Sequence, residues 1–121
     1  MHYMFLIYSQ ERAAGPPPEE IESIKSRHWG VMQDARQQGV LVAVEGLKPT
    51  QTATTIRVKN GKHLTIDGPF AETKEQLAGY YILDCKDLDE AIEWGKRIPT
   101  ACKGADGCIE IRPVAELPQG P

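Results

Sequence analysis

The sequence predicts a mixed α+β fold in which two helices cover one face of an antiparallel sheet. Three observations support this prediction: an uncharged run of aromatic and aliphatic residues at 2–8, two segments with apolar residues at helical spacing, and an Asn60–Gly61 dipeptide between two short strand-like segments. With the predicted hairpin set aside, the order of elements is β-α-β-β-α-β, which is the ferredoxin-like split βαβ plan. We therefore expect a single domain over residues 1–121, with an inserted β-hairpin.

The first strand and the first helix follow from the opening of the chain. Residues 2–8 carry no charged side chain, which predicts a strand buried on both faces and therefore central in its sheet. A connection over 9–18 ends in three prolines, and Glu19 and Glu20 then begin a helix that ends near Gly39. One stripe of this helix faces the core at helical spacing: Ile21, Ile24, His28, Val31, Met32 and Ala35.

The remaining elements follow from turn and cap signals. Asn60–Gly61 is a strong two-residue hairpin signal, because both residues tolerate positive φ. Asp87 caps a second helix that Pro99 ends. The predicted inner face of this helix consists of Leu88, Ala91, Ile92 and Gly95. The later predicted strands are Val40–Leu47, Thr54–Lys59, Lys62–Asp67, Ala78–Cys85 and Cys108–Val114.

This plan leaves one face of the sheet without helices. Strand 2–8 is apolar on both sides, so that face exposes apolar side chains unless something covers it. Large exposed apolar patches mark interaction sites. A second copy of the chain, packed sheet to sheet, is the simplest cover, and we expect a homodimer.

Charge and composition exclude several classes of function. The net charge of −3 argues against nucleic acid as the main ligand, since phosphate binding needs a basic face. No apolar run approaches the roughly 20 residues of a membrane span, and the first residues lack the features of a signal peptide. We therefore expect a cytoplasmic protein with no membrane partner.

The three cysteines do not form a metal-binding or thioredoxin-like motif, because no Cys-x-x-Cys pair is present. We interpret them as reduced thiols, with Cys85 packing as a small apolar residue. A redox pair of Cys102 and Cys108 is the alternative.

The densest group of function-capable side chains is the run Asp67–Glu75, which a Gly68–Pro69 turn explains only in part. With this run, the chain resembles the YCII-related proteins, in their DGPF-domain branch. The resemblance implies a dimeric α/β barrel of ferredoxin-like subunits and a His–Asp pair as active site, and a few relatives act as lyases on small unsaturated acids. The matching residues are Tyr3–Tyr8, His28, Glu45–Leu47, Thr54–Val58, Asp67–Glu75, Gly79–Ile82 and Glu110–Pro113.

His28 is the strongest candidate for a catalytic residue, because it lies on the inward stripe of its helix and its ordinary pKa of about 6.5 suits proton transfer. We expect its ring to lie within hydrogen-bonding reach of Asp67, which would orient it. Two plainer interpretations stay open: His28 as a core residue bonded to a backbone carbonyl, and Asp67 as a turn acid.

Further candidates could bind a substrate. Arg57 or Lys74 would hold an anionic group, although Lys74 and Glu75 also suit a solvated surface. Glu45 belongs either to an exposed strand end or to a pocket. Tyr80 and Tyr81 point to opposite sheet faces, one under a helix and the other toward a pocket or dimer face.

The residues suggest proton transfer without a cofactor, because no nucleotide motif is present. The first hypothesis is a lyase or isomerase that acts on a small anionic metabolite. The alternatives are a ligand-binding or regulatory dimer and a pathway-associated dimer without a ligand. A metal bound by His28 with Asp67 or Glu45 remains a minor alternative to a metal-free site.

Overall fold

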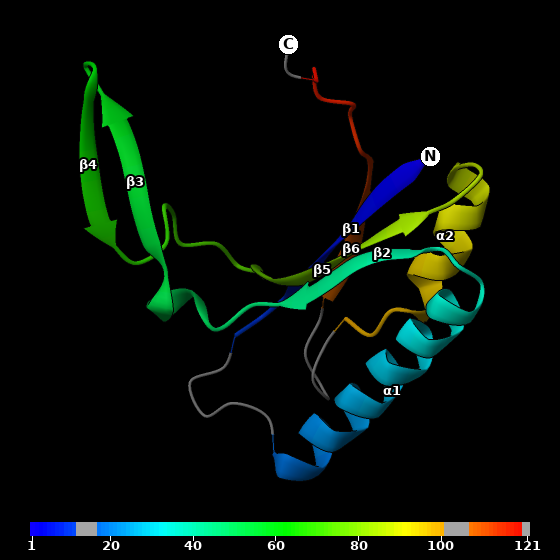
Figure 1. Cartoon of the computed structure of the whole chain (residues 1–121). Coiled ribbons are helices and arrows are strands. Elements are labelled where there is room, and N and C mark those ends of the chain that lie inside the picture. Colours follow the sequence, from blue (N-terminus) through cyan, green and yellow to red (C-terminus); the bar gives the residue numbers. More distant parts are fainter. Residues whose placement is uncertain (12–16, 101–106, 120–121) are drawn as a thin grey trace.

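The computed structural model describes residues 1–11, 17–100 and 107–119. Its centre is a four-stranded antiparallel sheet, with the strands in the order β2-β5-β1-β6 (Figure 1). These strands are β1 (His2–Ser9), β2 (Leu41–Gly46), β5 (Gln76–Asp84) and β6 (Gly107–Pro113). This mixed α+β arrangement is compatible with the predicted ferredoxin-like plan.

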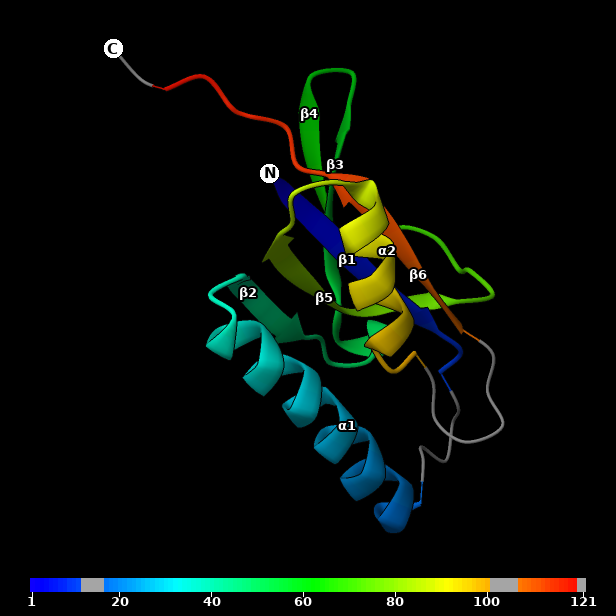
Figure 2. The ribbon, with the colours of Figure 1, turned by 90° about the vertical axis from the view of Figure 1, so that its right-hand side faces the viewer.

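Both helices lie on the same face of the sheet (Figure 2). Helix α1 (Pro18–Gln37) begins one residue before the predicted Glu19, and Glu19 and Glu20 occupy its first turn. Gly39 follows the helix with a φ of 72°, the left-handed conformation that commonly ends helices. No helix in the described part of the chain is long and apolar enough to cross a membrane.

Helix α2 (Leu88–Arg97) is capped as predicted, since the Asp87 side chain accepts a hydrogen bond from the Glu90 N–H at 2.9 Å. Its predicted inner face is wrong in part, because Leu88 is 50% exposed and Ile92 is 36% exposed. The buried stripe is instead Ala91, Trp94, Gly95 and Ile98. These residues keep the helical spacing, but the side of α2 that they form is rotated from the predicted one.

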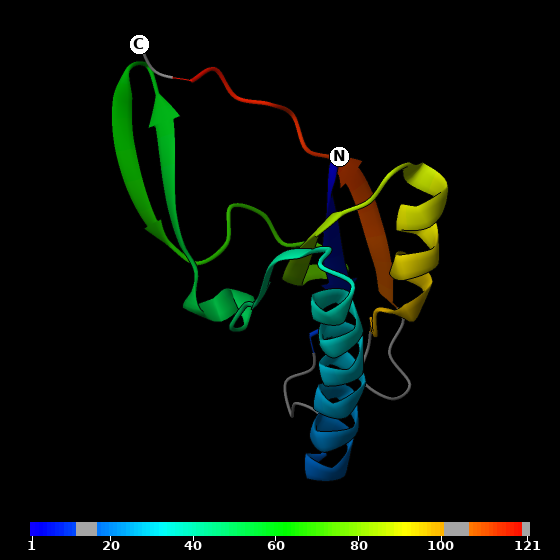
Figure 3. The same ribbon diagram turned by 45° about the vertical axis from the view of Figure 1, so that its right-hand side comes forward.

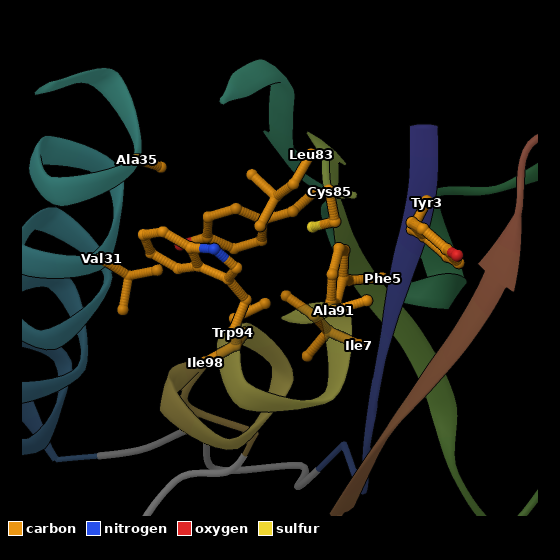
Figure 4. Close-up of a cluster of buried hydrophobic side chains, with 11 residues drawn as sticks. Tyr3, Phe5, Ile7, Val31, Ala35, Leu83, Cys85, Ala91, Trp94 and Ile98 are labelled. Atoms are coloured by element: carbon orange, nitrogen blue, oxygen red, sulfur yellow. The ribbon is translucent and has the colours of Figure 1, made fainter. Parts of the chain in front are cut away.

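The core lies between the helices and the sheet (Figure 4). Tyr81 and Phe5 are directly paired residues of the two central strands, and both are fully buried. Val31 of α1 and Trp94 of α2 point into the same space. Cys85 packs in this core as predicted, at 1% exposure, and burial raises the pKa of its thiol to about 11.

The opposite face of the sheet, here called the helix-free face, is covered by neither helix of the described residues (Figure 2). It carries alternate residues of the central strands, including Leu6 and Tyr80, flanked by Glu45 and Glu110 at the two edge strands. In β1, Tyr3, Phe5 and Ile7 are buried, whereas Met4, Leu6 and Tyr8 are only partly buried. Within one chain, β1 is therefore buried fully on one face alone.

The predicted hairpin is confirmed. Strands β3 (Thr54–Lys59) and β4 (Lys62–Asp67) pair through an Asn60–Gly61 turn in which both residues have positive φ, 52° and 74°. This hairpin, here called the arm, follows a short 3-10 helix at Thr50–Thr52. It stands away from the sheet on the side opposite to the helices (Figure 3).

Candidate functional site

His28 lies on the inner side of α1, where its helical phase predicted it. Its Nδ1 atom is 2.8 Å from the Tyr81 hydroxyl oxygen, and the two rings are stacked with their centroids 5.9 Å apart. Tyr81 comes from the centre of β5 and is fully buried, so its hydroxyl is held in place by the packing of the sheet. The pair therefore joins α1 to β5 through side chains 53 residues apart.

Both members of this pair are neutral near neutral pH. Burial, with a smaller contribution from the positive charge of Arg27, lowers the pKa of His28 from its ordinary value of 6.5. Burial also raises the pKa of Tyr81 to about 12. A neutral imidazole has one N–H and one free nitrogen, and the bond to Tyr81 occupies Nδ1, which leaves the other ring nitrogen for a ligand.

The pair forms part of the wall of a pocket of about 440 Å³ between α1 and the β2–β5 side of the sheet. Most of the lining is apolar, while the hydroxyls of Ser9 and Thr100 add polar groups. A mostly apolar hollow with a few convergent polar groups is the usual form of a small-molecule site. The other lining residues are Ile7, Ile24, Met32, Val44, Glu45, Gly46, Ala78, Gly79 and Pro99.

Gly79 allows β2 and β5 to approach closely beside the pocket. A Cβ atom at this position would lie 2.7 Å from the Glu45 backbone oxygen and 3.2 Å from the Gly46 Cα. Gly46, its partner in the sheet, has open space where its own Cβ would be. The small residue at 79 therefore determines the shape of this wall.

Asp67 is not a lining residue of this pocket. It is the last residue of β4, is exposed, and pairs with Thr54 across the arm. Among the described residues of one chain, the hydrogen-bond partner of His28 is therefore Tyr81, in place of the predicted Asp67 or a backbone carbonyl.

Glu45 borders the pocket, but its register pairs it with Tyr80 on the helix-free face. Because strand side chains alternate, Glu45 and Tyr80 point to the face opposite from Val44 and Tyr81. The predicted division of the two tyrosines is confirmed, with Tyr81 beneath the helices and Tyr80 on the other side.

Lys74 and Glu75 line a second hollow together with Tyr8 and Glu110. The Cys108 thiol lies 3.6 Å from a Glu75 carboxylate oxygen, and burial together with this acid raises the pKa of Cys108. Arg57 lies on the arm, where its guanidinium donates to the Phe70 carbonyl oxygen at 3.3 Å. The structure thus distributes the predicted substrate-binding residues over several places.

Tyr81 is a functional candidate that the sequence did not single out, because either Tyr80 or Tyr81 could be the tyrosine that packs under a helix. The available signal was its phase in β5, which places it on the helix-covered face below the inward stripe of α1. A buried phenol needs a hydrogen-bond partner, and so does a buried imidazole.

No three His, Cys, Asp or Glu side chains converge as a metal site in the ranges 1–11, 17–100 and 107–119. The Cys102–Cys108 redox pair cannot be placed, because Cys102 lies outside the described residues. Cys108 itself is an exposed free thiol.

The fold and pocket together define a small α+β protein with a neutral His–Tyr pair at a mostly apolar hollow. The YCII-related domain matches residues 1–118, and the chain belongs to this family. An uncharacterised protein of Rhizobium meliloti (strain 1021) is 38% identical over 116 residues, which cover 95% of this chain and 93% of the relative.

Proposed function

We propose that the chain is a cofactor-independent lyase or isomerase that moves a proton on a small unsaturated acid. The observation that supports this most is the His28–Tyr81 pair in the wall of the pocket. A neutral imidazole that is oriented by a fixed hydroxyl meets the requirements of a general base. The class of substrate comes from the resemblance to the DGPF-domain branch, whose run Asp67–Phe70 this chain carries.

The Tyr81 bond lets His28 act first as a base and then as an acid. When Nδ1–H donates to the Tyr81 oxygen, the other ring nitrogen is free to accept a proton from a substrate carbon. The ring is then an imidazolium whose Nδ1–H still donates to Tyr81, and its other nitrogen can return the proton to the substrate at a second carbon. A base that removes a proton at one carbon and returns it at another needs no redox cofactor.

The remaining predicted residues enter this proposal through a homodimer. Because Asp67, Arg57 and Lys74 do not line the His28 pocket of their own chain, a second copy would have to bring them there. The helix-free face supports such a dimer, since Leu6 and Tyr80 lie side by side on it without a covering layer. We propose sheet-to-sheet association across this face.

Hydrogen exchange into the ligand tests the proton-transfer step. A panel of small unsaturated carboxylic acids and their neutral lactones is incubated with the protein in D2O, and proton NMR follows loss of the carbon-bound hydrogen. We expect exchange with wild type, and a loss of about 10²-fold or more in His28→Gln. His63→Gln, which replaces an exposed arm histidine, is the matched control.

Tyr81 is tested in the same assay. Tyr81→Phe keeps the buried ring and removes the hydroxyl that orients His28, so we expect slower exchange and an altered pH profile. Tyr80→Phe makes the same change one residue away on the opposite face. Equal effects of the two variants, or full exchange in His28→Gln, would contradict the proposed mechanism.

A ligand-binding module without catalysis is the second candidate, and the mostly apolar lining of the pocket favours it. It predicts that a panel member raises the melting temperature while no carbon-bound hydrogen exchanges. Loss of that stabilisation in Tyr81→Phe would place the ligand in this pocket.

A further inference from the structure

The arm exposes more apolar surface than an isolated hairpin can maintain. Ile56 is 67% exposed and Val58 is 64% exposed, and both lie on one face of the hairpin. On the other face, Leu64 is 46% exposed and Ile66 is 41% exposed. A two-stranded hairpin alone in water is at best marginally stable, so its stability depends on further packing.

The hydrogen bonds of the arm to the rest of the described chain lie mainly at its base, apart from one that Arg57 donates to the Phe70 carbonyl. The Gly68 N–H donates to the Ala53 carbonyl at 2.7 Å, and the Thr55 hydroxyl donates to the Gly68 carbonyl at 2.8 Å. Beyond this base, β3 and β4 pair with each other and stand off the domain (Figures 1 and 3). The end that carries the turn is therefore available to another molecule.

The charge of the arm is opposite to that of the rest of the chain. Arg57, Lys59 and Lys62 lie along it, whereas Asp67 at its base is its one acid. The whole chain has a net charge of −3. Glu45 is exposed at the edge of the helix-free face, and no ion pair joins it to another described residue.

We propose that the arm of each copy docks on a second copy, at the β2 edge of its helix-free face. The inference rests on the proposed sheet-to-sheet dimer. It adds one contact, here called the clasp, in which the arm of each copy lies against the partner. The Leu64–Ile66 face would supply the apolar contact, because Lys59 and Lys62 lie on the same face of the hairpin and would meet Glu45 at that edge.

The dimensions of the arm agree with this arrangement. Six residues in a strand span about 20 Å, whereas stacked sheets lie about 10 Å apart. An arm of this length can extend past the interface between the two sheets and lie along a strand of the partner. Because both copies contribute the same arm and the same edge, the contact closes on itself around a twofold axis.

The apolar contact is tested by sedimentation equilibrium of the full chain. We expect Leu64→Asp combined with Ile66→Asp to raise the dimer dissociation constant about tenfold or more. Leu88→Asp, an exposed leucine on the helix side, should change it less than about twofold. If the arm variant and the control dissociate equally, the clasp is wrong.

Charge reversal gives a second test that does not depend on how the apolar variant folds. The arm variant, Lys59→Glu with Lys62→Glu, should form a weaker homodimer than the wild type. The edge variant, Glu45→Lys, should also form a weaker homodimer. When the two variants are mixed, each arm meets an edge of opposite charge, so we expect heterodimers to form in preference to either homodimer. Statistical mixing would overturn the inference.

The two proposals can fail separately. A wild-type chain that stays monomeric overturns both the dimer and the clasp. A stable wild-type dimer that neither arm variant weakens leaves the sheet-to-sheet association standing and overturns the clasp, and the arm then belongs to a different partner.

Discussion

At the scale of single residues, the chemistry of the pocket depends on burial of an imidazole without an acid beside it. His28 bonds to a phenol, and its pKa is lowered by burial first and by Arg27 second. A carboxylate partner would have acted in the opposite direction, by stabilising the imidazolium. The site therefore holds a base that is unprotonated at neutral pH.

The lowered pKa of His28 predicts how stability depends on pH. Below pH 6.5, the unfolded chain protonates this histidine before the folded chain does, so the free energy of unfolding falls as pH falls through that window. Above 6.5 the imidazole is neutral in both states and contributes no pH dependence. His28→Gln should show a shallower fall in urea unfolding between about pH 8 and about pH 5. Equal slopes in wild type and variant would contradict this prediction, and His63→Gln controls for loss of an exposed imidazole.

At the scale of elements, the site depends on how closely β2 and β5 approach. A Cβ at Gly79 would contact backbone atoms of Glu45 and Gly46, which cannot move aside as a flexible side chain could. The contact is beside the pocket, so a displaced β2 would also alter its wall.

Gly79→Ala is therefore expected to lower the free energy of unfolding by about 1–3 kcal/mol, the usual cost of overpacking. Gly46→Ala is the matched control on the facing strand, where nothing lies within 4 Å of the added atom. Its effect should be below about 1 kcal/mol. Urea denaturation measures both, and equal losses would show that the close approach at Gly79 is not the cause.

Elements were predictable from the sequence where their signals are local. The Asn60–Gly61 turn and the Asp87 cap depend on a few neighbouring residues, and both formed as expected. The inner face of α2 was not predictable to the same degree, because two overlapping apolar stripes share Ala91 and Gly95. Packing decides between them: a Cβ at Gly95 would lie 3.1 Å from Ile111 of β6, so this side of α2 is held against the sheet.

The hydrogen-bond partner of His28 was also not predictable from local sequence patterns. Helical phase correctly placed His28 on the inward stripe, but its partner depends on which strand passes beneath α1. Asp67 gives a strong local signal because it begins a dense polar run, but its position at the end of the arm is set by the hairpin insertion. Tyr81 gave a weaker signal, since a tyrosine in a central strand also fits a purely structural role.

At the scale of the whole molecule, the chain has two incompletely covered apolar surfaces, the helix-free face and the arm. If a second copy covers them, folding and association are linked, and stability rises with protein concentration. We expect the melting temperature to increase over an about hundredfold rise in concentration. The Leu64→Asp, Ile66→Asp variant should show a smaller increase. A melting temperature independent of concentration in the wild type would contradict a dimer that contributes to stability.

The hydrogen bond between the Leu47 N–H and the Ala78 carbonyl oxygen, 2.8 Å long, bears on the ancestry of this architecture. It brings together the two points where the chain leaves the sheet for the arm and returns from it. Segment 48–75 lies between these points, and a short turn could replace it without changing the order of the strands. None of its residues lines the His28 pocket. Insertions and deletions at this junction would therefore change what the chain offers to a second copy, while the pocket keeps the lining that its own chain supplies.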